Sequence, residues 1–424
     1  MSQGYKAIIT VLLLACRVHS AKAQVQPYAI LIRNGCVIDA RSRLHDTLDI
    51  AVADGHIVRM EKHIDPSQAA QVVDARGLFV TPGLIDLHTH VFYGIDPARA
   101  YCGGTEGVVP DGLSFRSGIT TMVDAGSSGW RDFPTFKKQV IDNSRTRVLA
   151  FVNIVGSGMR GSAYEQDTKD MDGKLTAQIA RQYKDYIVGV KVAHFVGPEW
   201  TPVDEAVKAG QLAGIPVMVD FGSNTPPLSI DELFFKHLRP GDIFTHCFGQ
   251  LKSREPIVDP VSKTLKPFVR EAQRHGTIFD VGYGEISFAF SQAIPALKTG
   301  FYPNSISTDI HVRNINGAMK DMLNVLSKFM AIGMPLDSVI AAATWNPARE
   351  IRHEELGHLS VGSPADITIL GLEQGRFGFF DYTGSRIEGR LRLECEMTIR
   401  DGKIVYDLNG IARPVVLPRN ILWD

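Results

Sequence analysis

Two histidines separated by one residue are the first feature of the sequence that points to chemistry. His88 and His90 close the run "GLIDLHTH" at 83–90, whose apolar residues predict a buried β-strand. Side chains on a strand alternate between its two faces, so both imidazoles point the same way. Buried imidazoles need polar partners, and a divalent cation is one partner that binds both. Alone, the pair also fits ordinary polar residues that cap a strand.

Four more polar side chains that could take part in chemistry occur in or directly after other apolar runs. They are Lys191 in "IVGVKVAHF", Asp220 in "IPVMVDFGS", His246 in "DIFTHCF" and Asp309 in "SISTDIH". A lysine inside such a run has to be paired, neutral or modified, because burial disfavours a charged ammonium. Singly, each residue has a structural explanation as a salt bridge, a hydrogen-bonded core histidine or a helix cap. The elements that carry them decide whether they form one site.

Those elements follow a repeating pattern between residues 81 and 354. Apolar runs alternate with helical stretches, which is typical of a parallel sheet with crossover helices. Eight runs can be named: "GLIDLHTH", "GITTMVDAGSSG", "VLAFVNIVGSG", "IVGVKVAHF", "IPVMVDFGS", "DIFTHCF", "TIFDVGYG" and "SISTDIH". Eight parallel strands in roughly 250 residues predict a (β/α)8 TIM barrel, whose chemistry lies at the C-terminal ends of the strands. We therefore expect the six residues to meet at one end of the barrel.

Both ends of the chain differ from the middle in their sequence pattern. Residues 24–80 and 355–424 contain short apolar runs separated by turns. The dipeptides Asp54-Gly55 and Asp401-Gly402 lie between such runs and are strong hairpin signals. The sequence therefore predicts a small composite β-sandwich, built from both ends of the chain and attached to the barrel.

The first 23 residues read as a secretory signal peptide. Their apolar run, 7–16, is too short to cross a bilayer, and Ala21-Lys22-Ala23 has the small-residue pattern of a cleavage site. We expect a secreted or periplasmic mature protein, with lipid attachment at Cys16 as the alternative. The other four cysteines are widely spaced, which predicts neither a disulfide framework nor a zinc knuckle.

The overall composition excludes some partners. The 424 residues include 45 Lys and Arg and 46 Asp and Glu, and the formal net charge is −1. This balance provides no electrostatic basis for binding nucleic acid. The composition fits a globular protein that acts on a small molecule, with no membrane contact beyond the export signal, and a homo-oligomer is compatible with it.

Several motifs together resemble the amidohydrolase superfamily. The stretch "VDARGLFVTPGLIDLHTH" at 73–90 is similar to the opening of the first barrel strand in that family. The stretch "GHLSVGSPADITIL" at 357–370 is similar to the return into the small domain, and "ATWNPAR" at 343–349 falls between them. The resemblance covers essentially the whole mature chain and is closest to the dihydroorotase-like deacetylases, which are binuclear metallohydrolases.

The resemblance implies a role for each residue. His88 and His90 would bind the more buried of two divalent ions together with Asp309. Lys191 would be carbamylated and would bridge both ions. A hydroxide shared by the two ions would attack the substrate carbonyl, and Asp309 would take its proton and pass it to the leaving group. Zinc is the expected metal, with manganese as the alternative.

The chain departs from the family pattern at two positions. Asp220 stands where the fifth strand usually carries a histidine that holds the second ion with His246. A carboxylate is also a competent ligand, but its charge favours harder cations such as manganese over zinc. Tyr283, in "FDVGYG", stands where close relatives often have a histidine, and we expect it in the substrate pocket. Its hydroxyl donates a hydrogen bond but is no base near neutral pH.

Other candidate residues bear on the substrate. Arg160 in "GSGMRGS" follows the third run and is a candidate clamp for a substrate carboxylate, although an exposed loop arginine is the alternative. His194 and His311 also lie near strand ends, without an assigned role. The sequence predicts deacylation of a small acylated amide or ester. The alternatives are a cyclic amidohydrolase related to dihydroorotase or hydantoinase, and a non-catalytic barrel that binds metal or ligand.

Overall fold

The computed structural model describes residues 26–95, 107–251 and 254–414. The expected signal peptide, residues 1–23 with Cys16, lies outside these residues, as does Cys102. In the described ranges, no helix combines the length and hydropathy that a membrane crossing requires.

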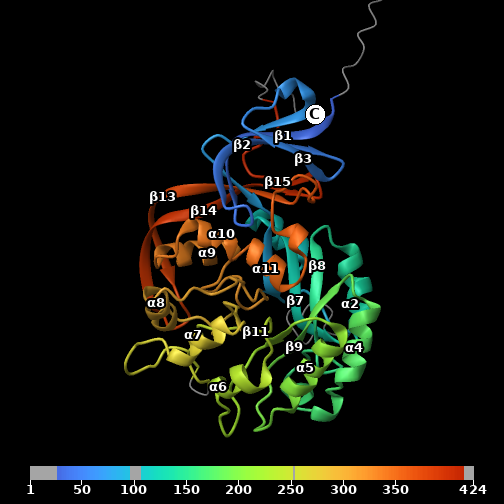
Figure 1. Ribbon diagram of the computed structural model, residues 1–424, viewed down its shortest axis with the longest axis vertical. Coiled ribbons are helices and arrows are strands. Elements are labelled where there is room, and N and C mark those ends of the chain that lie inside the picture. The colour runs from blue at the N-terminus through green and yellow to red at the C-terminus, as the bar shows by residue number, and fades with distance from the viewer. Residues whose placement is uncertain (1–25, 96–106, 252–253, 415–424) are drawn as a thin grey trace, which may run out of the picture.

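Both chain ends build one small domain, as the sequence predicts. Its strands are β1 (Tyr28–Asp39), β2 (Leu44–Ala53), β3 (His56–Glu61), β4 (Ala69–Asp74), β5 (Phe79–Pro82), β13 (Ile367–Phe380), β14 (Arg386–Arg400) and β15 (Lys403–Asp407). Instead of two separate sheets of a sandwich, the described strands form one mixed sheet in the order β15-β14-β13-β5-β1-β2-β3, with β4 paired to β1. In Figure 1 the blue N-terminal strands and the red C-terminal strands accordingly lie together at the top.

The two predicted hairpin turns occur where expected. Asp54 and Gly55 connect β2 to β3 with φ angles of 49° and 77°, and Asp401 and Gly402 connect β14 to β15 with φ angles of 54° and 70°. Positive φ at both central residues is the backbone that two-residue hairpins favour, and aspartate and glycine tolerate it. Strand β5 joins the chain ends because it pairs parallel with β1 and antiparallel with β13.

The middle of the chain forms a seven-stranded parallel sheet in chain order. Its strands are β6 (Leu84–Thr89), β7 (Ile119–Gly129), β8 (Arg147–Asn153), β9 (Ile187–Val192), β10 (Val217–Val219), β11 (Ile243–Phe244) and β12 (Ile278–Phe279). The eighth predicted run is not an extended strand here. It makes isolated parallel bridges on both sides, from Ser305 to Asp280 beyond β12 and from Ile310 to Thr89 of β6. Segment 305–310 therefore contacts both edges of the sheet.

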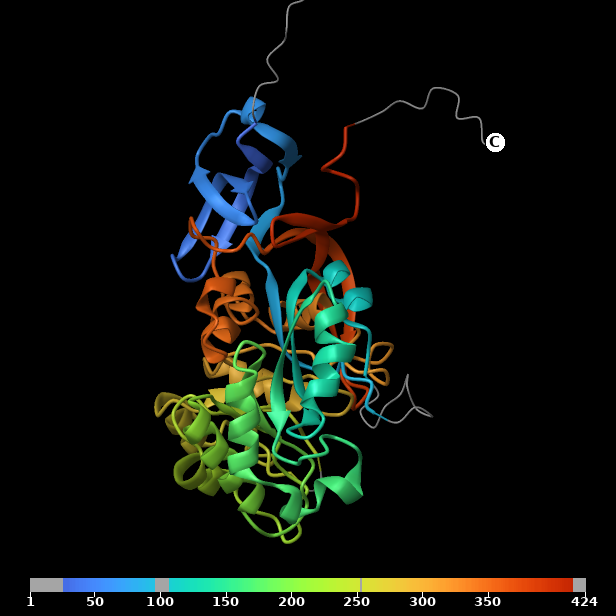
Figure 2. The same ribbon diagram turned by 90° about the vertical axis from the view of Figure 1, so that its right-hand side faces the viewer.

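Helices cover the outside of this sheet, as Figure 2 shows for the green segments. They are α1 (Pro110–Leu113), α2 (Phe133–Gln139), α3 (Ser162–Glu165), α4 (Gly173–Gln182), α5 (Thr201–Ala213), α6 (Ile230–Glu232), α7 (Pro267–Arg274), α8 (Phe290–Lys298), α9 (Met322–Ala331), α10 (Leu336–Ala341) and α11 (Trp345–Glu350). Local signals set their ends: the Asp172 carboxylate caps α4, and Gly214, with a φ of 72°, ends α5.

The hairpin of β13 and β14 joins the mixed sheet to the helices around the parallel sheet. It runs alongside α8 and α9 in Figure 1. The backbone N–H of Leu393 donates to the hydroxyl of Ser327 on α9 over 3.0 Å, and Phe379 and Leu393 are buried in the core that also holds the barrel helices. The strand ends that carry the candidate residues are thus held by a scaffold packed from both sides.

Candidate metal centre

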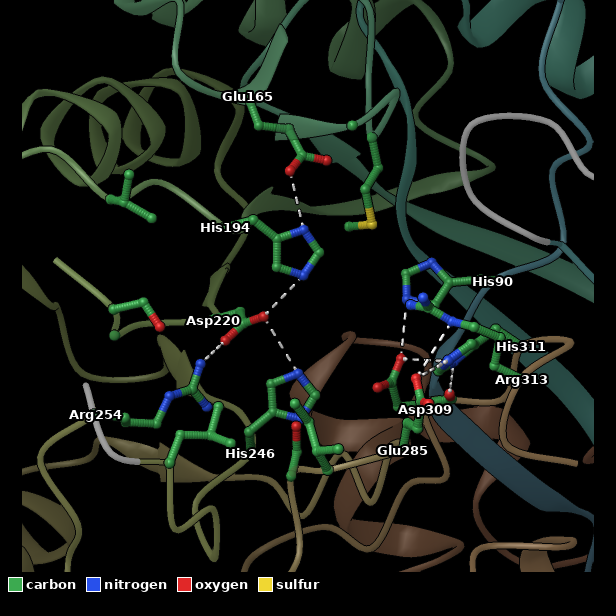
Figure 3. Close-up of a pocket in the computed structure, with 18 residues that line it drawn as sticks. His90, Glu165, His194, Asp220, His246, Arg254, Glu285, Asp309, His311 and Arg313 are labelled. Atoms are coloured by element: carbon green, nitrogen blue, oxygen red, sulfur yellow. Dashed lines mark hydrogen bonds and ion pairs between the residues drawn. The ribbon is translucent and has the colours of Figure 1, made fainter. Parts of the chain in front are cut away.

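A cavity of about 550 Å³ opens at the C-terminal ends of the barrel strands. Four of the six residues predicted to bind metal line it: His90, Asp220, His246 and Asp309 (Figure 3). The other two, His88 and Lys191, are each only 1% exposed, and the Nζ of Lys191 lies 3.0 Å from the Nε2 of His88. The structure therefore brings all six together, from the ends of four strands and from segment 305–310.

Among the described residues, His88, His246 and Asp309 form a cluster of potential metal ligands. One ligand atom from each lies within 4.8 Å of the others. The Oδ1 of Asp309 is 2.9 Å from the Nε2 of His90 and 3.4 Å from the Nε2 of His88. Nitrogen and carboxylate oxygen atoms at these separations are suited to a zinc-like divalent ion.

Hydrogen bonds hold the same ring nitrogen, Nδ1, of His246 and His88. The Nδ1 of His246 contacts the carbonyl oxygen of Gly282 over 2.5 Å, and since a carbonyl only accepts, this nitrogen carries the proton. The Nδ1 of His88 is 2.9 Å from the hydroxyl of Thr245, which donates to Asp280 over 2.7 Å and can then accept from the imidazole. Both rings therefore direct Nε2 toward the site, the orientation found in metal-binding histidines.

The remaining histidine of the pair has the same arrangement. The Nδ1 of His90 is 2.9 Å from the hydroxyl of Ser127, and its Nε2 faces Asp309.

Burial, together with the nearby Lys191 ammonium, lowers the pKa of His88 to about 3. His88 is therefore neutral at physiological pH, which is the protonation state a metal ligand requires.

Lys191 lies beside the donor set, in contact with His88. It is on β9, where burial lowers its pKa from the usual value. Its stem fits because residue 126 is glycine: a Cβ there would lie 2.6 Å from the Cγ of Lys191, and the φ of Gly126 is 88°. A lysine with a lowered pKa has a larger neutral fraction, and the neutral amine is the form that reacts with carbon dioxide.

Asp220 has three partners around its carboxylate. Its Oδ1 accepts from the guanidinium of Arg254, and its Oδ2 lies 3.3 Å from the Nε2 of His246 and 3.5 Å from the Nε2 of His194. Burial opposes ionisation, but the charges of Arg254 and His246 hold the pKa of Asp220 well below its usual range. Asp220 is thus a carboxylate, with one oxygen bound to arginine and the other facing two imidazoles.

The structure adds residues that the sequence left without a role. His194, Glu165, Arg254 and His311 all line the cavity. His194 and His311 follow apolar runs, so their positions at strand ends are the one sequence signal that could have found them. Glu165 ends the short helix α3 and Arg254 lies in a loop, and no spacing rule distinguishes either residue.

Two predicted substrate residues lie elsewhere. Met159 and Gly161 line the cavity, but Arg160 is not among its described lining residues, and its guanidinium lies 4.7 Å from the ring centre of Tyr164. Tyr283 is 1% exposed, with its hydroxyl bonded to the carbonyl of Phe380. Its pKa is raised by burial. Neither side chain is among the described residues that line the cavity, and their role in binding substrate stays a prediction.

The Thr245 bridge gives the first testable expectation. Replacing Thr245 by valine keeps the shape but removes the group that holds the Nδ1 of His88, so we expect metal affinity to fall about 10-fold to 100-fold. Isothermal titration of metal-free protein measures it. Thr120→Val is the matched control, because the hydroxyl of Thr120 is buried without a hydrogen-bond partner among the described residues. Equal affinity in both variants would mean that Thr245 does not orient the ligand.

Comparison with known proteins agrees with this geometry. Residues 290–405 match the model of the amidohydrolase family. A deacetylase of Agrobacterium fabrum is 32% identical over 361 residues, 83% of this chain and 85% of the relative. A deacetylase of Brucella anthropi is 34% identical over 335 residues, 77% of this chain and 80% of the relative.

Solved structures give the same result. A crystal structure of an adenine deaminase has a TM-score of 0.80 and 28% identity, and the match covers 90% of this chain and all of that one. A crystal structure of a dihydroorotase has a TM-score of 0.77 and 29% identity, over 89% of this chain and 99% of that one. The chain belongs to the amidohydrolase family, and its deacetylase relatives support a hydrolase that acts on small molecules.

Proposed function

We propose that this protein is a divalent-metal-dependent hydrolase that removes the acyl group from a small acylated amide or ester. One observation carries the proposal: three imidazoles present Nε2 to one site beside the Asp309 carboxylate, while each Nδ1 is bound to another group. The deacetylase relatives support the acyl chemistry. We also propose that segment 305–310 acts as the eighth strand of a closed (β/α)8 barrel.

The residues present fit two ions. His88, His90 and Asp309 would hold the first, and His246 with Asp220 the second. Lys191, carbamylated on Nζ, would lie between them. Nitrogen and oxygen donors of this kind suit zinc, and the extra carboxylate increases the affinity for manganese. When bound, such ions polarise a carbonyl and make water a nucleophile near neutral pH.

Asp309 is placed to move the proton. Its φ of 52° turns the carboxylate toward the histidines, and residue 284 is glycine, where a Cβ would lie 2.6 Å from the Oδ2 of Asp309. Its backbone carbonyl accepts from the Nδ1 of His311 over 2.8 Å and from Asn314 over 2.5 Å, which fixes the turn. The carboxylate accepts the proton of the attacking water and delivers it to the leaving nitrogen or oxygen.

Opening of a cyclic amide is the second candidate, because the dihydroorotase structure is similar over nearly its whole length. The test is a panel of N-acetyl and O-acetyl compounds and cyclic amides, assayed with metal-free protein and again after zinc or manganese is restored. We expect metal-dependent release of acetate. Turnover of cyclic amides alone would assign the second candidate, and turnover that does not depend on metal would overturn the proposal.

Asp220→His tests the second ion. This change restores the usual ligand and removes a negative charge, so zinc should be preferred over manganese more strongly than in the wild type. It also leaves Arg254, which is 8% exposed, without its carboxylate, and an unpaired buried charge costs about 3–5 kcal/mol. We therefore expect the single variant to melt at a lower temperature and Asp220→His/Arg254→Met to regain much of the loss.

Competition between zinc and manganese measures the metal preference of each variant. Calorimetry measures its melting temperature. An unchanged ratio of zinc to manganese affinity in the stable double variant would show that Asp220 is not a ligand.

A further inference from the structure

We propose that the Nε2 of His194 is a ligand of the second metal ion and supplies the imidazole that Asp220 replaces in this chain. This inference rests on the proposed function, since it needs a second ion beside Asp220 and His246. It assigns a role to a residue outside the strand-end positions that the family resemblance indicates.

The distances around Asp220 match those between ligands of one ion. Two donors bound at about 2.0–2.1 Å in a tetrahedral arrangement lie about 3.4 Å apart. The Nε2 atoms of His194 and His246 lie 3.5 Å and 3.3 Å from the same Oδ2 of Asp220. Figure 3 shows both rings directed at this oxygen from different sides. An ion bound to Asp220 therefore has both imidazoles within reach after small side-chain movements.

A buried carboxylate orients the His194 ring. The Oε2 of Glu165 lies 3.0 Å from the Nδ1 of His194, and the Glu165 side chain is 3% exposed. An ionised carboxylate only accepts, so the Nδ1 of His194 carries the proton and, in the neutral ring, Nε2 keeps its lone pair for the cavity. Carboxylate, histidine and metal in a row is a recurring arrangement in metal sites. The other oxygen of Glu165 is buried and has no partner among the described residues, so His194 is its principal contact.

The backbone holds His194 in an unfavourable conformation. Its φ is 55°, close to those of His246 at 56° and Asp309 at 52°. A left-handed conformation costs a residue with a side chain about 1–2 kcal/mol and persists where surrounding contacts enforce it. The side chain of Gln166 does so here: it donates to the carbonyl of His194 over 2.8 Å and accepts from the N–H of Val196 over 2.9 Å. The C-terminal end of α3, with Glu165 and Gln166, thus fixes both the ring and the backbone of His194.

The alternative is a purely structural bridge, in which a charged His194 pairs with Glu165 and Asp220 and contacts no metal. A metal ligand and a structural bridge at His194 predict different numbers and affinities of bound ions. If His194 is a ligand, His194→Ala should reduce zinc uptake of metal-free protein from about two ions per chain to about one. Glu165→Gln keeps an acceptor but removes the charge, and should weaken the second site about 10-fold to 100-fold.

The experiment combines elemental analysis and isothermal titration with zinc for the wild type and three variants. His237→Ala is the matched control, because the Nδ1 of His237 also bonds a carboxylate, that of Asp204 over 2.7 Å, but His237 is not among the described lining residues of the cavity. Cobalt substitution adds a spectrum: loss of an imidazole ligand should change the visible absorption in His194→Ala and leave it unchanged in His237→Ala.

The outcomes separate the two proposals. If the wild type binds two ions and His194→Ala also binds two with the same affinities and cobalt spectrum, His194 is not a ligand and only this inference fails. If the wild type itself binds fewer than two ions, the two-ion site fails and the inference fails with it.

Discussion

Lys191→Ala is expected to abolish hydrolysis and to prevent the protein from holding two ions. The side chain is buried, with its Nζ 3.0 Å from the Nε2 of His88, and the charges of Asp220 and Asp309 both act on it. A carbamylated lysine would add an anion that neutralises part of the metal charge, and alanine removes it. We expect kcat/KM to fall by about 10³-fold or more. Steady-state kinetics and metal content on the same preparation measure both effects.

A rescue experiment identifies the role of the missing group. Small carboxylic acids added to Lys191→Ala should restore part of the activity if a bridging anion is what was lost. Lys328→Met is the matched control for a buried lysine: Lys328 is also 1% exposed but bonds the hydroxyl of Tyr283 over 2.6 Å. Its loss should lower stability and leave metal content unchanged. Near wild-type activity in Lys191→Ala would mean that Lys191 only supports the fold.

Asp309→Asn is expected to have the second largest effect. Asparagine keeps the shape of the side chain but no longer accepts the proton of the attacking water, and general acid–base catalysis contributes about 10²-fold to 10⁴-fold. The neutral amide is also a weaker ligand than a carboxylate, so affinity for the first ion should fall. The activity should therefore be measured at saturating metal. Activity within a few fold of the wild type under those conditions would remove Asp309 as the proton carrier.

The grouping of the proposed metal ligands could be predicted because strand ends are a local property of the sequence. His88 and His90 share a face of one strand, and Lys191 lies inside another, so the alternation of buried strands and helices was enough to bring them together. The contacts of Glu165 with His194 could not be predicted in this way. They join loops that follow different strands, and no periodicity relates positions in two loops.

The same limit explains the residues that the structure places outside the cavity. Arg160 follows a strand, but the next turns direct its guanidinium over the ring of Tyr164. Tyr283 follows β12, where its hydroxyl reaches Phe380 of the long β13–β14 hairpin, a contact between segments about a hundred residues apart. The hairpin turns were predicted because aspartate and glycine permit positive φ. The joining of both chain ends into one sheet depends instead on long-range pairing through β5.

The most direct test of the proposed two-ion hydrolase site is the metal content of the purified protein. Elemental analysis should be made after metal-free protein has been saturated with zinc or manganese and loosely bound ions have been removed. We expect about two ions per chain, and treatment with a chelator should abolish hydrolysis of acylated substrates until metal is restored. A protein that binds no ion, or that hydrolyses these substrates equally well without one, would contradict it.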